Sequence, residues 1–267
     1  MCLLSFYPAD VTPDTDALSN GAYVNDDGHG FAVVAGKRII VRRGMDAERM
    51  VAEFARIRSK HRSGPALFHS RFGTHGTLTK ANCHPFRIGH DSRTVLAHNG
   101  ILPKSVQPKK GDKRSDTRIA AEDFLPRSPF NLFDSQGARD VLARWLTRSN
   151  KIVILTVNPR YRHNAYILHE EHGIWDSGIW YSNSDYRGVD PTWATPAEWE
   201  SWLAHTEHDQ CRTCREVGVI DTITRFCRVC GTCDDCGEED GHCVCYMPTT
   251  LADHAQRRDL AHDTLTG

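Results

Sequence analysis

The sequence predicts a layered α+β domain built on antiparallel sheets, followed by a small metal-binding module. Two observations support this fold class. Over the first 190 residues, short strand-like segments lie too close together for helical crossovers, which favours antiparallel pairing. Of the ten cysteines, all but Cys2 and Cys83 lie between Cys211 and Cys245, so the cysteine-rich end forms a separate region.

The composition is that of a folded protein without a dominant charge. The chain has 267 residues, 33 Lys and Arg against 34 Asp and Glu, and 39% hydrophobic residues. A net charge of -1 gives no global field toward nucleic acid or an anionic membrane, although a local basic patch is compatible with it. Because the sequence has no run of about 18 apolar residues and no signal-peptide pattern, we expect a cytoplasmic protein without a membrane span.

Helical and strand-like segments alternate through the first region. Asp46 to His61 carries apolar residues on one helical face, and Gly137 to Leu146 predicts a second amphipathic helix. Phe31 to Val41 predicts a hairpin that turns at Gly36. Further strands are predicted at Cys2–Tyr7, Ala66–His69, Thr94–Ala97, Lys151–Val157, Ala165–His169 and Gly173–Tyr181.

Two connecting segments complete the domain plan. Leu102 to Arg114 is rich in Lys and contains Pro, which predicts a solvated linker, with a mobile lid as the alternative. Thr195 to Glu198 combines an N-cap, a first-turn Pro and a capping-box Glu, and therefore predicts a helix to about His205. We accordingly expect domains at residues 1–205 and 206–246, and a flexible tail at 247–267.

Cys2 directly follows the initiator methionine, and a small second residue normally permits removal of that methionine. Removal leaves Cys2 with a free α-amine, whose ordinary pKa of about 7.7 to 8.0 suits a base at neutral pH. The thiol, with an ordinary pKa of about 8.5, then has a general base on its own residue. An ordinary buried cysteine is the alternative interpretation.

Several polar motifs follow Cys2 in a particular order. They are NDDGHGF at Asn25–Phe31, HSRFGTHG at His69–Gly76, NCHPF at Asn82–Phe86, LAHNGI at Leu96–Ile101, and Ser115-Asp116-Thr117. Together with Cys2, their order and spacing resemble the glutaminase domain of class II glutamine amidotransferases, which are N-terminal nucleophile (Ntn) hydrolases. The resemblance covers about residues 2 to 190. It implies a four-layer αββα sandwich of antiparallel sheets.

The resemblance implies a catalytic role for three residues. Cys2 would attack the side-chain amide of glutamine, giving a γ-glutamyl thioester and ammonia, with no cofactor for catalysis. The Asn99 side-chain amide and the Gly100 backbone N–H would form the oxyanion hole, since two preorganised donors suit a developing O⁻. An Asn-Gly hairpin turn is the structural alternative for that pair.

The resemblance also implies the residues that bind the substrate. Arg71 matches the family residue that binds the α-carboxylate, a task that suits a planar guanidinium. Asp116 matches the acid that holds the α-ammonium; alternatively, Ser115 or Asp116 caps the helix that begins there. The segment that covers bound glutamine matches Thr74, His75 and Gly76.

Two features near these motifs bear on the comparison with the family. Phe72-Gly73 replaces the aromatic-Ala or aromatic-Ser pair common in the family, which is a mild departure. His75, His84 and His98 are expected to pack and form hydrogen bonds, because the α-amine already supplies the base.

The cysteine-rich region has metal-ligand spacing. Cys211-x-x-Cys214 and Cys227-x-x-Cys230 are typical of a four-thiolate zinc ribbon, and Cys233, Cys236, Cys243 and Cys245 follow. Eight thiolates fill two tetrahedral sites, so two structural zinc ions are predicted. Either the first four cysteines share one ion, or Cys211 and Cys214 pair with Cys233 and Cys236. An iron–sulfur site is the alternative to zinc, but no Pro follows the regular run of cysteines.

Three functions fit these observations. The first is a glutaminase that uses L-glutamine and supplies ammonia to a separate synthase, because nothing after residue 190 is long enough to be one. The second is a hydrolase acting on a γ-glutamyl peptide or similar compound. The third is a non-catalytic zinc-binding adaptor, which the complete set of site residues disfavours. Balanced charge in the cysteine-rich region favours a protein partner over nucleic acid.

Overall fold

The structure is a computed structural model that describes residues 2–73, 76–127 and 131–188, and, near the cysteines, residues 211, 213, 226–227 and 230–233. The chain divides into two units, Met1–Asp190 and Pro191–Gly267. The predicted helix from Thr195 and the predicted domain boundaries lie outside the described residues. In the described part of the chain, no helix has both the length and the apolar character needed to cross a bilayer.

The first unit contains a six-stranded antiparallel sheet with the strand order β3-β2-β4-β1-β10-β9. The predicted hairpin is present, with Ala35 paired to Arg38 across Gly36. The predicted single strand from Gly173 to Tyr181 is wrong, because Ser177 and Gly178 have positive φ angles and turn the chain into a hairpin. The strands are β1 (Leu3–Tyr7), β2 (His29–Ala35), β3 (Arg38–Gly44), β4 (Ala66–Ser70), β9 (Ile174–Asp176) and β10 (Ile179–Tyr181).

A second sheet of four antiparallel strands has the order β5-β6-β7-β8. Its strands are β5 (Phe86–Ile88), β6 (Asp91–Asn99), β7 (Lys151–Thr156) and β8 (Ala165–Leu168). Asn99, the last residue of β6, pairs with Lys151, the first residue of β7. The Asn99-Gly100 pair is therefore not a two-residue hairpin turn, because the chain travels through two helices before β7 begins.

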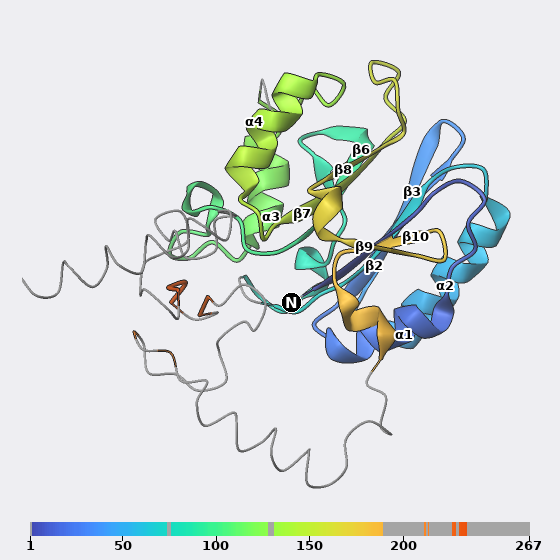
Figure 1. The fold of residues 1–267 in the computed structure, drawn as a ribbon, viewed down its shortest axis with the longest axis horizontal. Coiled ribbons are helices and arrows are strands. Elements are labelled where there is room, and N and C mark those ends of the chain that lie inside the picture. Colours follow the sequence, from blue (N-terminus) through green and yellow to red (C-terminus); the bar gives the residue numbers. More distant parts are fainter. Residues whose placement is uncertain are drawn as a thin grey trace, which may run out of the picture. The chain divides into compact units, whose positions relative to one another are not determined.

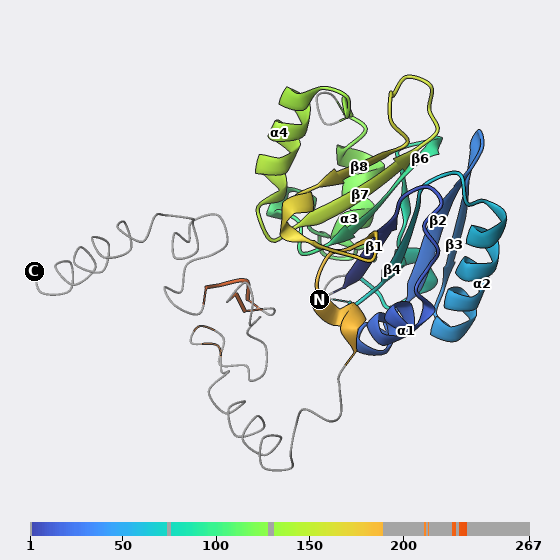
Figure 2. The ribbon, with the colours of Figure 1, turned by 45° about the vertical axis from the view of Figure 1, so that its right-hand side comes forward.

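Helices cover the outer face of each sheet (Figures 1 and 2). The first sheet carries α1 (Thr15–Val24) and α2 (Ala47–Lys60), and the second carries α3 (Asp116–Ile119) and α4 (Gln136–Leu146). Asp46 and Ser135 cap α2 and α4 by accepting hydrogen bonds from backbone N–H groups. The shorter helical segments are η1 (Lys80–Asn82), η2 (Lys104–Val106), η3 (Ala120–Phe124, which continues α3), η4 (Glu170–His172) and η5 (Ser184–Arg187).

Three apolar layers hold these elements together. Leu3 points toward α1 and α2, whereas its neighbour Leu4 points between the sheets, as strand alternation requires. Val95 and Val153 of the second sheet meet Leu4 in that central layer, and Leu142 of α4 packs in the third. The predicted α+β class and the four-layer αββα sandwich are therefore confirmed.

Candidate active site

Strand ends from both sheets and the start of α3 meet at one pocket, here called the Cys2 pocket. Cys2 precedes β1 and Arg71 follows β4, and the pairing of Leu3 with Ser70 brings them to the same end of the first sheet. Gly100 follows β6 and Asp116 begins α3. The pocket is lined by Cys2, Arg71, Phe72, His84, His98, Gly100, Ser115, Asp116 and Thr117.

The remaining predicted site residues are placed differently. Asn99 precedes Gly100 in the sequence, and its side chain is buried but does not line this pocket. Gly76 is exposed and has a φ of +75°, and it does not line the pocket either. Thr74 and His75 lie outside the described residues.

The surroundings of Cys2 hold its backbone and sulfur. The Phe72 backbone N–H donates to Cys2 Sγ at 3.3 Å, and Asn183 Nδ2 donates to the Cys2 carbonyl at 3.0 Å. Burial raises the pKa of the Cys2 thiol, although the Phe72 hydrogen bond and the Arg71 charge act in the opposite direction. The thiol is therefore the resting form near neutral pH, and nucleophilic attack requires a base that removes its proton.

The Asn99 side chain is held by a serine from the neighbouring sheet. Asn99 Nδ2 donates to Ser182 Oγ at 2.8 Å, and Ser182 Oγ also accepts from the Leu4 N–H at 2.9 Å. Asn99 Oδ1 is buried and has no hydrogen-bond partner among the described residues. A half-turn of the amide keeps the same heavy-atom positions, lets Ser182 donate to Oδ1, and frees Nδ2.

Gly100 adopts a backbone conformation that requires glycine. Its φ is +132°, and a Cβ atom there would collide with the Asn150 side chain. Asn150 Oδ1 accepts a hydrogen bond from His98 Nε2 at 2.7 Å. His98 Nδ1 in turn lies 2.9 Å from Thr117 Oγ1. These contacts fix the β6 terminus against the start of α3.

Arg71 and Asp116 supply opposite charges to the pocket. Arg71 is 3% exposed, and its Nη1 donates to the Thr77 carbonyl at 3.2 Å. The Asp116 carboxylate is 5% exposed and accepts from the N–H groups of Leu102 at 2.9 Å and Thr117 at 2.6 Å. Ser115 caps α3. Asp116 is therefore not needed as the cap, and its side chain lines the pocket.

Three buried histidines lie together at the Cys2 pocket, and two of them, His84 and His98, line it. His69 Nε2 donates to the His98 carbonyl at 2.9 Å, and the His69 and His84 rings are 3.9 Å apart between centroids. The His98 N–H donates to His84 Nδ1 at 3.3 Å. Burial lowers the pKa of His69 to about 3, and it lowers the pKa values of His84 and His98 as well. These rings are therefore neutral near pH 7.

Sequence reasoning missed several residues that support the site through hydrogen bonds. Ser182, Asn183 and Asn150 are single polar residues at strand ends, with no motif around them to mark them. Asn82 was noted only as part of NCHPF, yet its side chain bonds the Thr77 and Lys113 carbonyls and the Ser115 N–H. One available signal was the position of Ser182-Asn183 directly after a strand-like segment.

The second unit, described by itself, contains a cluster of three thiols. The Sγ atoms of Cys211, Cys227 and Cys230 lie within 4.8 Å of one another, and Cys211 and Cys230 are 3.5 Å apart. Thiolates around a tetrahedral zinc at 2.3 Å are about 3.8 Å apart, so the cluster has suitable dimensions. Cys233 is buried but outside this cluster, and Cys214, Cys236, Cys243 and Cys245 lie outside the described residues.

Part of this chain matches a known protein family. Residues 3–119 match the family described as glutamine amidotransferases class-II. The matched segment contains Arg71, Asn99, Gly100 and Asp116, and it begins one residue after Cys2.

Individual relatives resemble parts of this chain. The glutamine–fructose-6-phosphate aminotransferase (isomerizing) of Saccharomyces cerevisiae is 32% identical over 103 residues, which cover 36% of this chain and 14% of that protein. The glutamine phosphoribosylpyrophosphate amidotransferase from B. subtilis, solved with ADP and GMP, aligns with a TM-score of 0.45 and 17% identity. A structure of the allosteric regulatory enzyme of purine biosynthesis aligns with a TM-score of 0.43 and 17% identity. Each alignment covers 68% of this chain and 41% of the other.

Proposed function

We propose that the first unit is a glutaminase that hydrolyses the side-chain amide of L-glutamine through a thioester on Cys2. The observation that carries this proposal is the meeting of a thiol, a guanidinium and a carboxylate, from Cys2, Arg71 and Asp116, in one pocket beside Gly100. A free amino acid carries a carboxylate and an ammonium group. Arg71 and Asp116 have the charges that bind them, which leaves the substrate's amide for Cys2.

The first chemical step is attack by the Cys2 sulfur. After removal of Met1, the Cys2 α-amine takes the thiol proton as the sulfur attacks the amide carbon. The raised pKa of the thiol makes this base necessary. The C–N bond then breaks, and the proton passes from the α-amine to the leaving nitrogen, which departs as ammonia. Water hydrolyses the γ-glutamyl thioester, yielding glutamate and restoring the thiol.

The negative charge that develops on the amide oxygen needs donors. Gly100 supplies its backbone N–H, and Asn99 supplies Nδ2 once its amide has turned so that Oδ1 accepts from Ser182. The unpartnered Oδ1 supports this rotation, because the turned amide satisfies both of its polar atoms when substrate is bound. The role proposed for Ser182 is therefore to position the donor.

We expect one wall of the Cys2 pocket to move when glutamine enters. The volume of the Cys2 pocket is about 20 Å³, which is room for about one water molecule. Phe72 is 37% exposed, and the Gly73 N–H donates to Asp27 Oδ2 at 2.7 Å. We expect Phe72 and Gly73 to move outward when substrate enters and to close over it afterwards.

The ammonia is proposed to serve an acceptor enzyme on a separate polypeptide. Support for this comes from the amidotransferase match, which covers residues 3–119. This chain spans 14% of the length of the yeast relative, whose printed name includes an aminotransferase activity. We therefore propose that the reaction that consumes the ammonia takes place outside the first unit.

The cysteine-rich region is proposed to bind structural zinc, with two ions for the eight cysteines. The cluster of Cys211, Cys227 and Cys230 supports the arrangement in which these three share an ion with Cys214. The Cys230 N–H donates to Cys227 Sγ at 3.5 Å, a contact that stabilises thiolate charge. Zinc analysis of Cys211→Ser against unaltered protein tests this, and an unchanged metal content would contradict it.

Covalent labelling provides the test of the catalytic proposal. The full chain is incubated with a glutamine-mimicking diazoketone, and the labelled residue is mapped by mass spectrometry. We expect one label on Cys2, protection by L-glutamine, and release of glutamate and ammonia by untreated protein. A label confined to other residues would contradict the mechanism. Stronger protection by a γ-glutamyl peptide would favour the peptide hydrolase, and absence of both labelling and turnover would favour the adaptor.

A further inference from the structure

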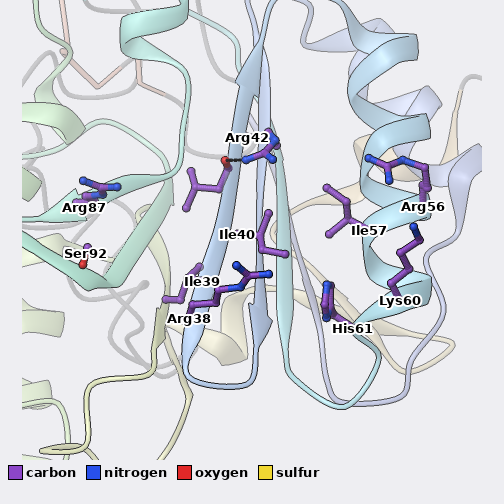
Figure 3. A pocket seen from close by; sticks show the side chains of 11 residues that line it. Arg38, Ile39, Ile40, Arg42, Arg56, Ile57, Lys60, His61, Arg87 and Ser92 are labelled. Atoms are coloured by element: carbon purple, nitrogen blue, oxygen red, sulfur yellow. Dashed lines mark hydrogen bonds between the residues drawn. The ribbon is translucent and has the colours of Figure 1, made fainter.

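A second concave surface lies along the edge of the six-stranded sheet. It is a groove of about 470 Å³ that follows β3, and none of its lining residues lines the Cys2 pocket. Figure 3 shows Arg56, Lys60 and His61 from the α2 region on one side of the strand, and Arg87 and Ser92 from β5 and β6 on the other. This surface is called the β3 groove below.

The β3 groove carries a local excess of positive charge in a chain whose net charge is -1. Its cations are Arg38, Arg42, Arg56, Lys60 and Arg87, and all five are exposed. Glu53 lies 3.1 Å from Arg42 and 4.0 Å from Arg56. In the described part of the chain, no ion pair involves Arg38, Lys60 or Arg87.

The strand that forms the floor of the groove has an open side. β3 is the terminal strand of its sheet, and none of its seven residues is fully buried. An edge strand presents unpaired backbone N–H and C=O groups that can receive another strand. Ile39, Ile40 and Val41 are half-buried, so apolar surface lies between the cations. The Val41 carbonyl already accepts a hydrogen bond from the Arg42 side chain at 2.9 Å.

We propose that the β3 groove binds an extended, acidic segment of a partner protein, which pairs with β3 as an additional strand. Because successive side chains of a strand point to opposite faces, the partner's carboxylates would meet the cations on the α2 flank of β3, and its apolar side chains would cover Ile39 and Val41 on the other flank. This interaction does not depend on the catalytic proposal, because the two sites share none of the residues that the structure describes.

The arrangement of the groove favours a strand over other anionic ligands. A single phosphate group calls for cations or N–H groups that converge on one point, whereas these five cations come from β3, α2 and β5. Single-stranded nucleic acid binds largely by stacking on aromatic rings, and among the described residues that line the groove there is no Phe, Tyr or Trp. Half-buried Ile and Val side chains next to an open sheet edge instead suit a peptide with alternating acidic and apolar residues.

A designed peptide tests the proposal with the full chain. The probe is a fluorescent eight-residue peptide of alternating glutamate and valine, whose binding is followed by fluorescence anisotropy at low salt. Two further peptides carry backbone N-methyl groups on alternate residues. One is methylated at the odd-numbered residues and the other at the even-numbered residues. Because alternate N–H groups of a strand point to opposite sides, we expect one methylation pattern to weaken binding at least 10-fold and the other to leave it almost unchanged.

Charge reversal locates the binding site. We expect Arg38→Glu/Lys60→Glu/Arg87→Glu to weaken peptide binding at least 10-fold. The matched control is Arg127→Glu/Arg144→Glu/Arg148→Glu, which changes the net charge equally at exposed arginines outside the groove and should bind as the unaltered chain does. Hydrogen exchange at residues 38–44 should slow when the peptide is saturating.

Several results would overturn the proposal. One is the absence of peptide binding, and another is equal binding of both methylated peptides, which would mean attraction by charge alone. Equal weakening by the two triple variants would also overturn it. Tighter binding of an eight-nucleotide single strand, without protection of β3 amides, would make the groove a nucleic-acid surface instead.

Discussion

The Cys2 pocket and the β3 groove differ in how they present charge. In the pocket, Arg71 and Asp116 are almost fully buried and held by backbone groups at fixed distances. In the groove, five cations are exposed on long side chains. Burial with fixed partners preorganises charge for chemistry, whereas exposed charge at an open strand suits reversible association. Substitutions in the two regions should therefore differ in their effects, and the largest effect is expected in the pocket.

Removal of the nucleophile should have the largest effect. We expect Cys2→Ala to lower glutaminase activity by at least about 10³-fold, because no thioester can form. Glutamate release provides the measurement. Cys83→Ala is the matched control, since Cys83 is a buried thiol that does not line the pocket, and its activity should remain within a few fold. Comparable losses in both variants would mean that Cys2 is not the nucleophile.

The Asn99–Ser182 pair should give the next largest effect. Loss of one oxyanion-hole donor typically costs about 10² to 10³ in kcat, which is the expectation for Asn99→Ala. Ser182→Ala should lower kcat about 10-fold with little change in KM, because Ser182 acts only through the Asn99 amide. When Asn99 is already replaced by Ala, Ser182→Ala should lower kcat no further. Additive losses would show that Ser182 acts independently of Asn99.

Substitution of the charged substrate ligands should alter binding more than turnover. We expect Arg71→Lys to raise the KM for glutamine about 10-fold to 100-fold, since an ammonium group cannot make two parallel bonds to a carboxylate. The discriminating substrate is a glutamine analogue without the α-carboxylate, which should be a poor substrate for both proteins. If Arg71→Lys raised the KM for the analogue by the same factor as the KM for glutamine, Arg71 would not be the carboxylate ligand.

The buried histidines should make stability depend on pH. Burial lowers the pKa of His69 to about 3, so below pH 6.5 the unfolded chain binds a proton that the folded chain does not. Stability is therefore greatest above pH 6.5 and falls as the pH drops toward 3, by up to about 1.4 kcal/mol per pH unit for each such histidine. Urea unfolding of His69→Gln should depend less on pH than unfolding of the unaltered chain, and an equal pH dependence of the two proteins would contradict this role of His69.

The smallest expected effect is that of substitutions in the β3 groove on glutaminase activity. Arg38→Glu/Lys60→Glu/Arg87→Glu should leave glutaminase activity within about twofold of the unaltered chain, because none of the three residues lines the Cys2 pocket. Steady-state assays with glutamine test this at low and at physiological salt. A loss of 10-fold or more would show that the groove contributes to catalysis, and the separation between chemistry and docking would then be wrong.

Much of the fold could be predicted from local sequence patterns. The hairpin at Gly36 and the amphipathic helix after Asp46 have strong periodic signals, and both are present. Helix α1 was missed because small residues such as Ala17, Gly21 and Ala22 form its buried face. The hairpin between β9 and β10 was missed because Ser177 adopts a positive φ, which serine rarely does.

The candidate site could be predicted only where residues lie in recognisable motifs. Cys2, Arg71 and Asp116 follow from the resemblance, and the structure brings them to one pocket. Ser182 and Asn150 could not be predicted, since their importance depends on contacts with Asn99 and His98 that are distant in the sequence. The β3 groove was also hidden, because its cations are spread over three elements and the net charge conceals them.

The Cys2 α-amino group can be tested directly as the base that activates the thiol. Two preparations of the same protein are compared, one with Cys2 exposed as the first residue by proteolytic removal of an N-terminal tag and one with the tag uncleaved. The account predicts glutamine turnover by the first preparation and at least about 10³-fold less by the second, with equal thermal stability. Equal turnover by the two preparations would contradict it, because the α-amine could not then be the base that activates the thiol.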